Sequence, residues 1–224
     1  MQPARSTYAG VARPGVLETN KVLKNTYLLL AATLLFSAAT AGIAMFTGMR
    51  PMNPFIVLAV YFGLLFATAK TRNSALGLLF VFALTGFMGL TLGPIINLYM
   101  TMLPNGNQVV MTALGTTGAV FLGLSAYAVK SRRDFSFMGG FLFVGILGAF
   151  ILGIVALLFN MPTLSLAVSA MFVLAMGGLI LYQTSEILRG GETNYIMATV
   201  TLYVSIYNLF TSLLHLLGAM SGDD

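Results

Sequence analysis

Polar side chains recur along the last apolar stretch of the chain, residues 193–217. One row of polar or small residues repeats at alternating spacings of four and three, which places its members on one face of a helix. A polar side chain that faces lipid finds no hydrogen-bond partner, so this row and a second one beside it should turn toward protein or a water-filled cavity. The first row comprises Asn194, Ala198, Thr201, Ser205, Asn208, Ser212 and His215, and the second comprises Thr199, Tyr203, Tyr207 and Thr211.

The two rows allow two interpretations of this stretch. At ~1.5 Å rise per residue it is long enough to cross a bilayer, yet it is too polar to face lipid. Its polar rows either hydrogen-bond neighbouring helices together or also line a path for ions or protons. Under both interpretations the helix lies in the middle of a bundle, and the more apolar segments are expected to surround it.

A few polar residues outside these rows extend the candidate polar core. Glu186 lies three residues from Arg189, which permits a local ion pair or leaves a functional acid near the cytoplasmic end. Gln183 lies one turn deeper, and Asn97 lies on the third apolar segment; both amides suit packing inside a bundle. His215 is expected near the outer interface, as an anchor or a pH sensor. The candidate core or pore residues are Asn97, Gln183, Glu186, Thr201, Ser205, Asn208 and His215.

No combination of residues indicates an enzyme. Ser125 lies in a stretch that resembles a serine loop, and His215 could act as its base. Ser125 is expected ~7 Å from the cytoplasmic boundary and His215 ~30 Å from it, whereas a nucleophile and its base lie within ~3 Å. The chain has no cysteine, one histidine and six acidic residues, which argues against thiol chemistry and a transition-metal site. Phosphate-loop and dinucleotide motifs are absent, so no cofactor is expected.

The composition is that of an integral membrane protein. Hydrophobic residues make up 58% of the chain and charged residues only 8%, against about 25% charged residues in soluble domains. Despite the net charge of +5, the basic residues lie between apolar segments rather than on one amphipathic face, so nucleic acid is not an expected partner. Residues 1–24 contain no apolar core, and we expect a flexible tail there rather than a signal peptide.

Seven apolar segments that are able to cross a lipid bilayer follow this tail. Lys and Arg accumulate in cytoplasmic loops, and ten of the eleven basic residues fall on one side of this arrangement, with Arg50 alone on the other. The N-terminus is therefore expected in the cytoplasm and residues 219–224 outside, with a transmembrane domain over 25–218. The segments are 25–46, 54–69, 74–100, 108–129, 137–159, 164–188 and 193–217.

Spaced glycines in two of these segments predict close helix packing, because small residues let helix backbones approach each other in lipid. The third segment carries Gly86, Gly89 and Gly93, and the fifth carries Gly145, Gly148 and Gly153.

Five blocks of the sequence match the motifs of one known family: Asn20–Tyr27, Thr85–Gly89, Leu92–Ile95, Gly190–Ile196 and Leu202–Phe210. They resemble the Bax inhibitor/YccA family, most closely its bacterial YccA branch. The resemblance covers nearly the whole chain beyond the tail. It implies a seven-helix fold in which the other six helices surround the last one, which agrees with the polarity of that helix.

The resemblance also implies a function. YccA-like proteins are associated with the membrane-bound AAA protease FtsH, as substrate and as modulator, and other branches with a pH-sensitive calcium leak. Those other branches carry an aspartate pair, and the matching positions here are Gln183 and Ser205, which cannot titrate. We therefore expect a protein of the bacterial inner membrane that binds and restrains an FtsH-type protease and is also its substrate. A calcium or proton leak channel or transporter is the alternative.

Overall fold

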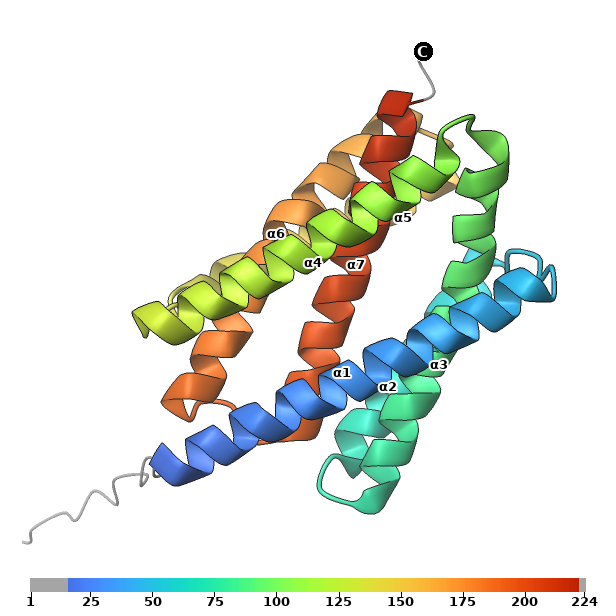
Figure 1. Ribbon diagram of the computed structural model, residues 1–224. Coiled ribbons are helices and arrows are strands. Elements are labelled where there is room, and N and C mark those ends of the chain that lie inside the picture. The colour runs from blue at the N-terminus through green and yellow to red at the C-terminus, as the bar shows by residue number, and fades with distance from the viewer. Residues whose placement is uncertain (1–15, 222–224) are drawn as a thin grey trace, which may run out of the picture.

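The computed structural model describes residues 16–221, which form seven helices (Figure 1). Most of the predicted N-terminal tail and the last three residues, 222–224, lie outside the described residues. Every helix is long and apolar enough to cross a membrane, so the predicted all-α fold with seven spans is confirmed. The helices are α1 (Val16–Phe46), α2 (Pro54–Thr71), α3 (Ala75–Met102), α4 (Gly106–Ser131), α5 (Met138–Leu158), α6 (Pro162–Arg189) and α7 (Tyr195–Ser221).

The first and last helices are longer than the sequence predicts. α1 starts at Val16, so residues 16–24, predicted as tail, are helical. The charged residues in this stretch interrupt the apolar periodicity that predicts a helix. Val22 and Leu23 nevertheless pack against the core. α7 likewise runs on to Ser221, into the region predicted as a C-terminal tail.

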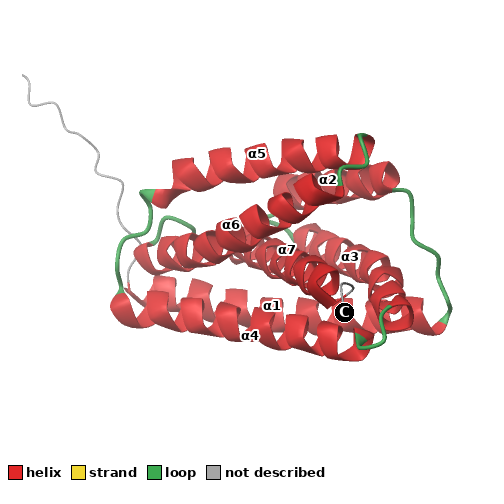
Figure 2. Ribbon diagram, turned by 90° about the horizontal axis from the view of Figure 1, so that it is seen from above, coloured by secondary structure: helices red, strands yellow, loops and turns green. Residues whose placement is uncertain are grey.

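The helices lie in three layers, with α7 in the middle one (Figure 2). α7 packs mainly against α1, α3, α4 and α6, whereas α2 packs on α3 and α5 packs on α6. The last helix is therefore central, as predicted, but four neighbours rather than six make its main contacts. The outer position of α5 follows from its sequence, because Met138–Leu158 contains no polar side chain and can face lipid over most of its surface.

Glycines of α3 bring its backbone against α1. A Cβ atom added at Gly89 would collide with the Ser37 carbonyl of α1, and one at Gly93 would collide with the Ala41 carbonyl. The predicted close packing is thus confirmed on α3. On α5 the prediction is wrong for Gly145 and Gly148, which have open space where a Cβ atom would lie.

The basic loops gather at one end of the bundle. Asn194, directly before α7, donates its Nδ2 hydrogens to the Arg72 carbonyl at 3.0 Å and to Asn73 Oδ1 at 2.8 Å. Ser185 near the end of α6 donates its hydroxyl to the Arg133 carbonyl at 3.2 Å. These contacts join the α2–α3, α4–α5 and α6–α7 connections. We call this region the basic end; it comprises residues 19–24, 70–73, 130–137 and 186–194.

Candidate functional site

The second polar row of α7 hydrogen-bonds this helix to α1 and α3. The Tyr203 hydroxyl lies 2.6 Å from Ser37 Oγ on α1 and donates to the Thr85 carbonyl on α3 at 3.2 Å. One turn along, the Tyr207 hydroxyl lies 3.3 Å from Thr91 Oγ1 on α3. Both tyrosines belong to the second polar row, which is predicted to face protein or a cavity, although neither is among the seven candidate core or pore residues.

The middle of the first polar row bonds within its own helix. Ser205 donates its hydroxyl to the Thr201 carbonyl at 2.7 Å, and Asn208 donates from Nδ2 to the Val204 carbonyl at 2.8 Å. Such bonds satisfy polar side chains without a neighbouring helix or a cavity. Together with the tyrosine contacts, they favour the interpretation in which α7 holds the bundle together.

His215 meets a serine of α6 rather than Ser125. Its Nδ1 lies 2.8 Å from the Ser169 hydroxyl, which also donates to the Ser165 carbonyl at 3.1 Å. Both bonds are satisfied together when Nδ1 carries the hydrogen and Ser169 accepts it. In that arrangement the histidine does not receive the serine proton, as a catalytic base must, so this pair links α6 to α7.

The remaining amides of the candidate core lie in different environments. Gln183 on α6 and Ser205 on α7, at the positions where an aspartate pair occurs in other branches, are both buried. The Gln183 Nε2 group has no hydrogen-bond partner among the described residues. Asn97 is exposed on the outside of α3, so its predicted role in bundle packing is wrong. The pattern around Asn97 could not reveal this, because Ile96 and Tyr99 beside it do pack against α4 and α7, and which face of α3 they share depends on the tertiary arrangement.

The ion pair predicted for Arg189 forms with a different acid. Its guanidinium lies 3.1 Å from the Asp134 carboxylate in the α4–α5 loop, and the predicted pair with Glu186 is absent from the described contacts. The hydroxyl and amide of Ser136 donate to Asp134 Oδ1 at 2.6 and 2.9 Å. These hydrogen bonds lower the pKa of the Asp134 carboxyl, and nearby Arg189 lowers it further. Glu186 instead lies beside Gly191, at the turn that leads into α7.

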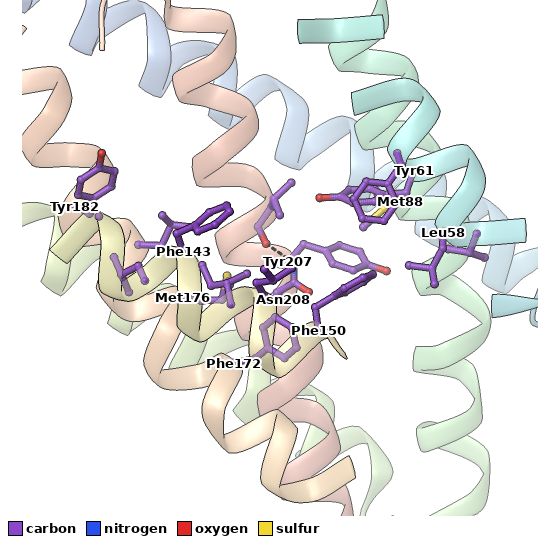
Figure 3. Close-up of a pocket in the computed structure, with 18 residues that line it drawn as sticks. Leu58, Tyr61, Met88, Phe143, Phe150, Phe172, Met176, Tyr182, Tyr207 and Asn208 are labelled. Carbon is purple, nitrogen blue, oxygen red and sulfur yellow. Dashed lines mark hydrogen bonds between the residues drawn. The ribbon is translucent and has the colours of Figure 1, made fainter. Parts of the chain in front are cut away.

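A groove of about 690 Å³ opens between α2 and α5 and reaches α7. Apolar side chains such as Phe143, Phe150 and Phe172 form its walls, and the partly buried side chains of Tyr207 and Asn208 on α7 also line it (Figure 3). The described residues that line it include no carboxylate, amine or imidazole. The groove can therefore accommodate an apolar chain, but its side chains offer no group that exchanges a proton near neutral pH.

The described residues contain no group of three His, Cys, Asp or Glu side chains that could hold a metal ion. A calcium site therefore has no support from these side chains, since this cation prefers several oxygen ligands, carboxylates above all. The arrangement defines a multi-pass helical membrane protein whose interior polar side chains bond either to their own helix backbone or to a neighbouring helix.

Comparison with known sequences gives the family of this membrane protein. The family model described as inhibitor of apoptosis-promoting Bax1 matches residues 19–222. The chain therefore belongs to the Bax inhibitor family, as its sequence blocks predict.

Its relatives include bacterial proteins of similar length. An uncharacterised protein of Pseudomonas aeruginosa is 53% identical over 92% of this chain and 93% of its own. An uncharacterised membrane protein of Vibrio cholerae is 47% identical over 93% of each chain. The Escherichia coli protein named modulator of FtsH protease YccA is 47% identical over 94% of this chain and 95% of its own. None of these names denotes an enzyme.

Proposed function

We propose that this protein resides in the bacterial inner membrane, where it binds and restrains a membrane-bound AAA protease of the FtsH type and is also a substrate of that protease. The observation that carries the proposal is the 47% identity, over 94% of the chain, to a relative named as a modulator of FtsH protease. A relative from another Escherichia coli strain is named as an inner membrane protein, which supports the location.

The interior of the bundle supports an interaction protein over an ion leak. Tyr203 and Tyr207 use their hydroxyls to join helices, and Ser205 bonds to its own backbone. Gln183 and Ser205 cannot change charge with pH, so a switch built on a carboxylate pair has no counterpart at these positions. The surface of the bundle is then the part of the molecule that a partner contacts.

The distribution of charge supports a cytoplasmic position for the basic end. Eight of the eleven Lys and Arg residues lie in the segments that make up this end of the bundle, and Lys and Arg are retained in short cytoplasmic loops. The ATPase ring of an FtsH-type protease works on the cytoplasmic side. In this orientation the N-terminus and three inter-helix connections face the ring.

Two measurements on the intact protein test this proposal. The first is affinity purification in mild detergent from cells that contain the protease, in which the protease is expected to copurify. The second is a chase of another membrane substrate of the protease while this protein is overproduced, in which that substrate is expected to decay more slowly. An unrelated seven-span protein at the same level is the control.

An unchanged decay rate of the second substrate would refute the restraining role. Equal slowing by the control protein would also count against it, because crowding of the membrane would then explain the effect. If the protease copurifies but the second substrate decays at an unchanged rate, the protein binds the protease without restraining it.

A further inference from the structure

A crevice of about 610 Å³ lies between α1 and α4 at the basic end. These two helices form one outer layer of the bundle (Figure 2), and they approach each other where the rings of Tyr27 and Phe121 have centroids 6.1 Å apart. Lys24 from α1 and Lys130 from the last turn of α4 both line the crevice. Its volume lies within the ~300–1,000 Å³ typical of sites for small ligands.

The crevice changes from basic to apolar along its length. Lys130 belongs to the last turn of α4, where the candidate membrane span Gly106–Ser131 ends. Ala126 and Leu122 lie deeper on the same helix, about one and two turns further from that boundary at ~5.4 Å per turn. No acidic side chain occurs among the described residues that line the crevice. Leu122 and Ala126 are both exposed, so such a site has a cationic end at the depth of lipid headgroups and an apolar wall open to the acyl chains.

A buried hydroxyl adds a polar group to this wall. Ser125 is 5% exposed and contributes to the wall of the crevice. Its Oγ has no hydrogen-bond partner among the described residues, although buried hydroxyls in proteins are almost always paired. The Oγ atom has almost no surface open to the crevice in this structure, so the ester carbonyl of a bound glycerolipid would reach it only after a rotation of the Ser125 side chain.

We propose that this crevice is a binding site for one anionic phospholipid. The phosphate group lies between Lys24 and Lys130, and one acyl chain runs inward past Leu122 and Ala126. Basic pockets between membrane-spanning helices select anionic headgroups by charge. The larger groove between α2 and α5 offers no such selection, because no charged side chain occurs among its described lining residues.

The test is a titration of phosphatidylglycerol into the full-length protein in a zwitterionic detergent, followed by native mass spectrometry to count retained lipid. The wild type should retain one phosphatidylglycerol in preference to phosphatidylcholine. Lys24→Gln with Lys130→Gln should weaken this binding roughly twenty-five-fold, since each basic group near a headgroup contributes about a factor of five. Ala126→Phe should also remove binding, because it fills the apolar part without a change in charge.

Two matched variants separate this site from general attraction to a basic surface. Lys70→Gln with Arg72→Gln removes the same charge at the basic end, outside the crevice, and should leave binding intact. Lys24→Arg with Lys130→Arg keeps the charge and should bind as the wild type does, even if the glutamine variant fails to fold. Three outcomes would each overturn the proposal. The first is an equal loss of phosphatidylglycerol binding in the Lys70 and Arg72 variant. The others are equal retention of phosphatidylcholine by the wild type and displacement of the lipid by inorganic phosphate alone.

Discussion

Ser37 on α1 and Tyr203 on α7 are 166 residues apart in the sequence, yet their hydroxyl oxygens lie 2.6 Å apart inside the bundle. The same tyrosine hydroxyl donates to the Thr85 carbonyl of α3. One phenol therefore joins three helices at a place where Tyr203 is only 1% exposed. Since water has little access there, no solvent molecule can easily replace a lost partner.

Replacement of Tyr203 by phenylalanine tests this contact. Tyr203→Phe keeps the ring but leaves Ser37 Oγ and the Thr85 carbonyl without this partner. The free energy of unfolding should fall by about 1 kcal/mol, in the range found for hydrogen bonds between membrane helices. The measurement is reversible unfolding in mixed micelles, followed by circular dichroism.

An exposed tyrosine provides the matched control for this substitution. Tyr127 is 46% exposed, so Tyr127→Phe should change stability by much less. Ser37→Ala combined with Tyr203→Phe should cost less than the two single changes added together, because both remove the same bond. Strict additivity would contradict the assignment of this bond.

The approach of α3 to α1 predicts a second effect. Gly89→Ala should lower the free energy of unfolding by about 1–3 kcal/mol, because the added Cβ meets the Ser37 carbonyl and the α1 backbone must shift. Gly148→Ala on α5 is the matched control, since a Cβ atom there meets open space. That control should be neutral or stabilising by about 0.5–1 kcal/mol. Equal effects at the two positions would show that α1 and α3 are not in close contact.

Hydrophobic periodicity was sufficient to predict the seven helices and the central position of α7. These features depend on segment length and on the polarity of one face, which the sequence contains directly. The start of α1 could not be predicted in this way. Its first turns extend past the apolar region, and they are helical because residues such as Val22 and Leu23 pack on other helices.

The errors in the candidate site concern partners that are distant in the sequence. Arg189 pairs with Asp134 because the α4–α5 loop folds against the end of α6, and spacing within one helix cannot reveal such a contact. The glycines of α3 and α5 have similar spacing, yet only α3 has a neighbour close enough to need them. Local sequence patterns predict which faces of a helix carry polar or small residues. Which helix or loop packs against each face depends on the tertiary arrangement.

Calcium flux gives a third prediction. The protein in liposomes should show no increase in calcium flux between acidic and neutral pH, because Gln183 and Ser205 carry no charge that titrates. Gln183→Asp with Ser205→Asp should introduce a pH dependence, because both positions are buried and the carboxyl groups placed there would change their charge with pH. Gln183→Asn with Ser205→Thr is the uncharged control. A pH-dependent flux in the unaltered protein would contradict the prediction and direct attention to Glu186.

The last prediction concerns the residues before α1 and depends on the proposed partnership with the protease. An AAA protease begins at a chain end that it can grip and then pulls. Residues 1–15 lie outside the described residues, and their sequence, with two prolines, two glycines and few apolar residues, predicts a segment too polar to pack. Beyond them, each helix is costly to extract because its apolar surface must leave lipid. A substrate whose chain end is easily gripped, but whose membrane helices resist extraction, would occupy the protease for a long time.

Removal of Arg5 to Gly15 should therefore lengthen the lifetime of this protein in cells that contain the protease and leave it unchanged in cells that lack it. The deletion ends before Val16, where α1 begins, so the bundle should keep its stability in detergent. The shortened protein would still dock but resist engagement, and it should slow the decay of a second substrate more strongly than the full-length protein does. A glycine–serine segment of equal length in place of residues 5–15 should restore turnover, because length and flexibility rather than a specific motif are required. If the shortened and full-length proteins decay equally fast in protease-containing cells, the protease starts elsewhere on the chain.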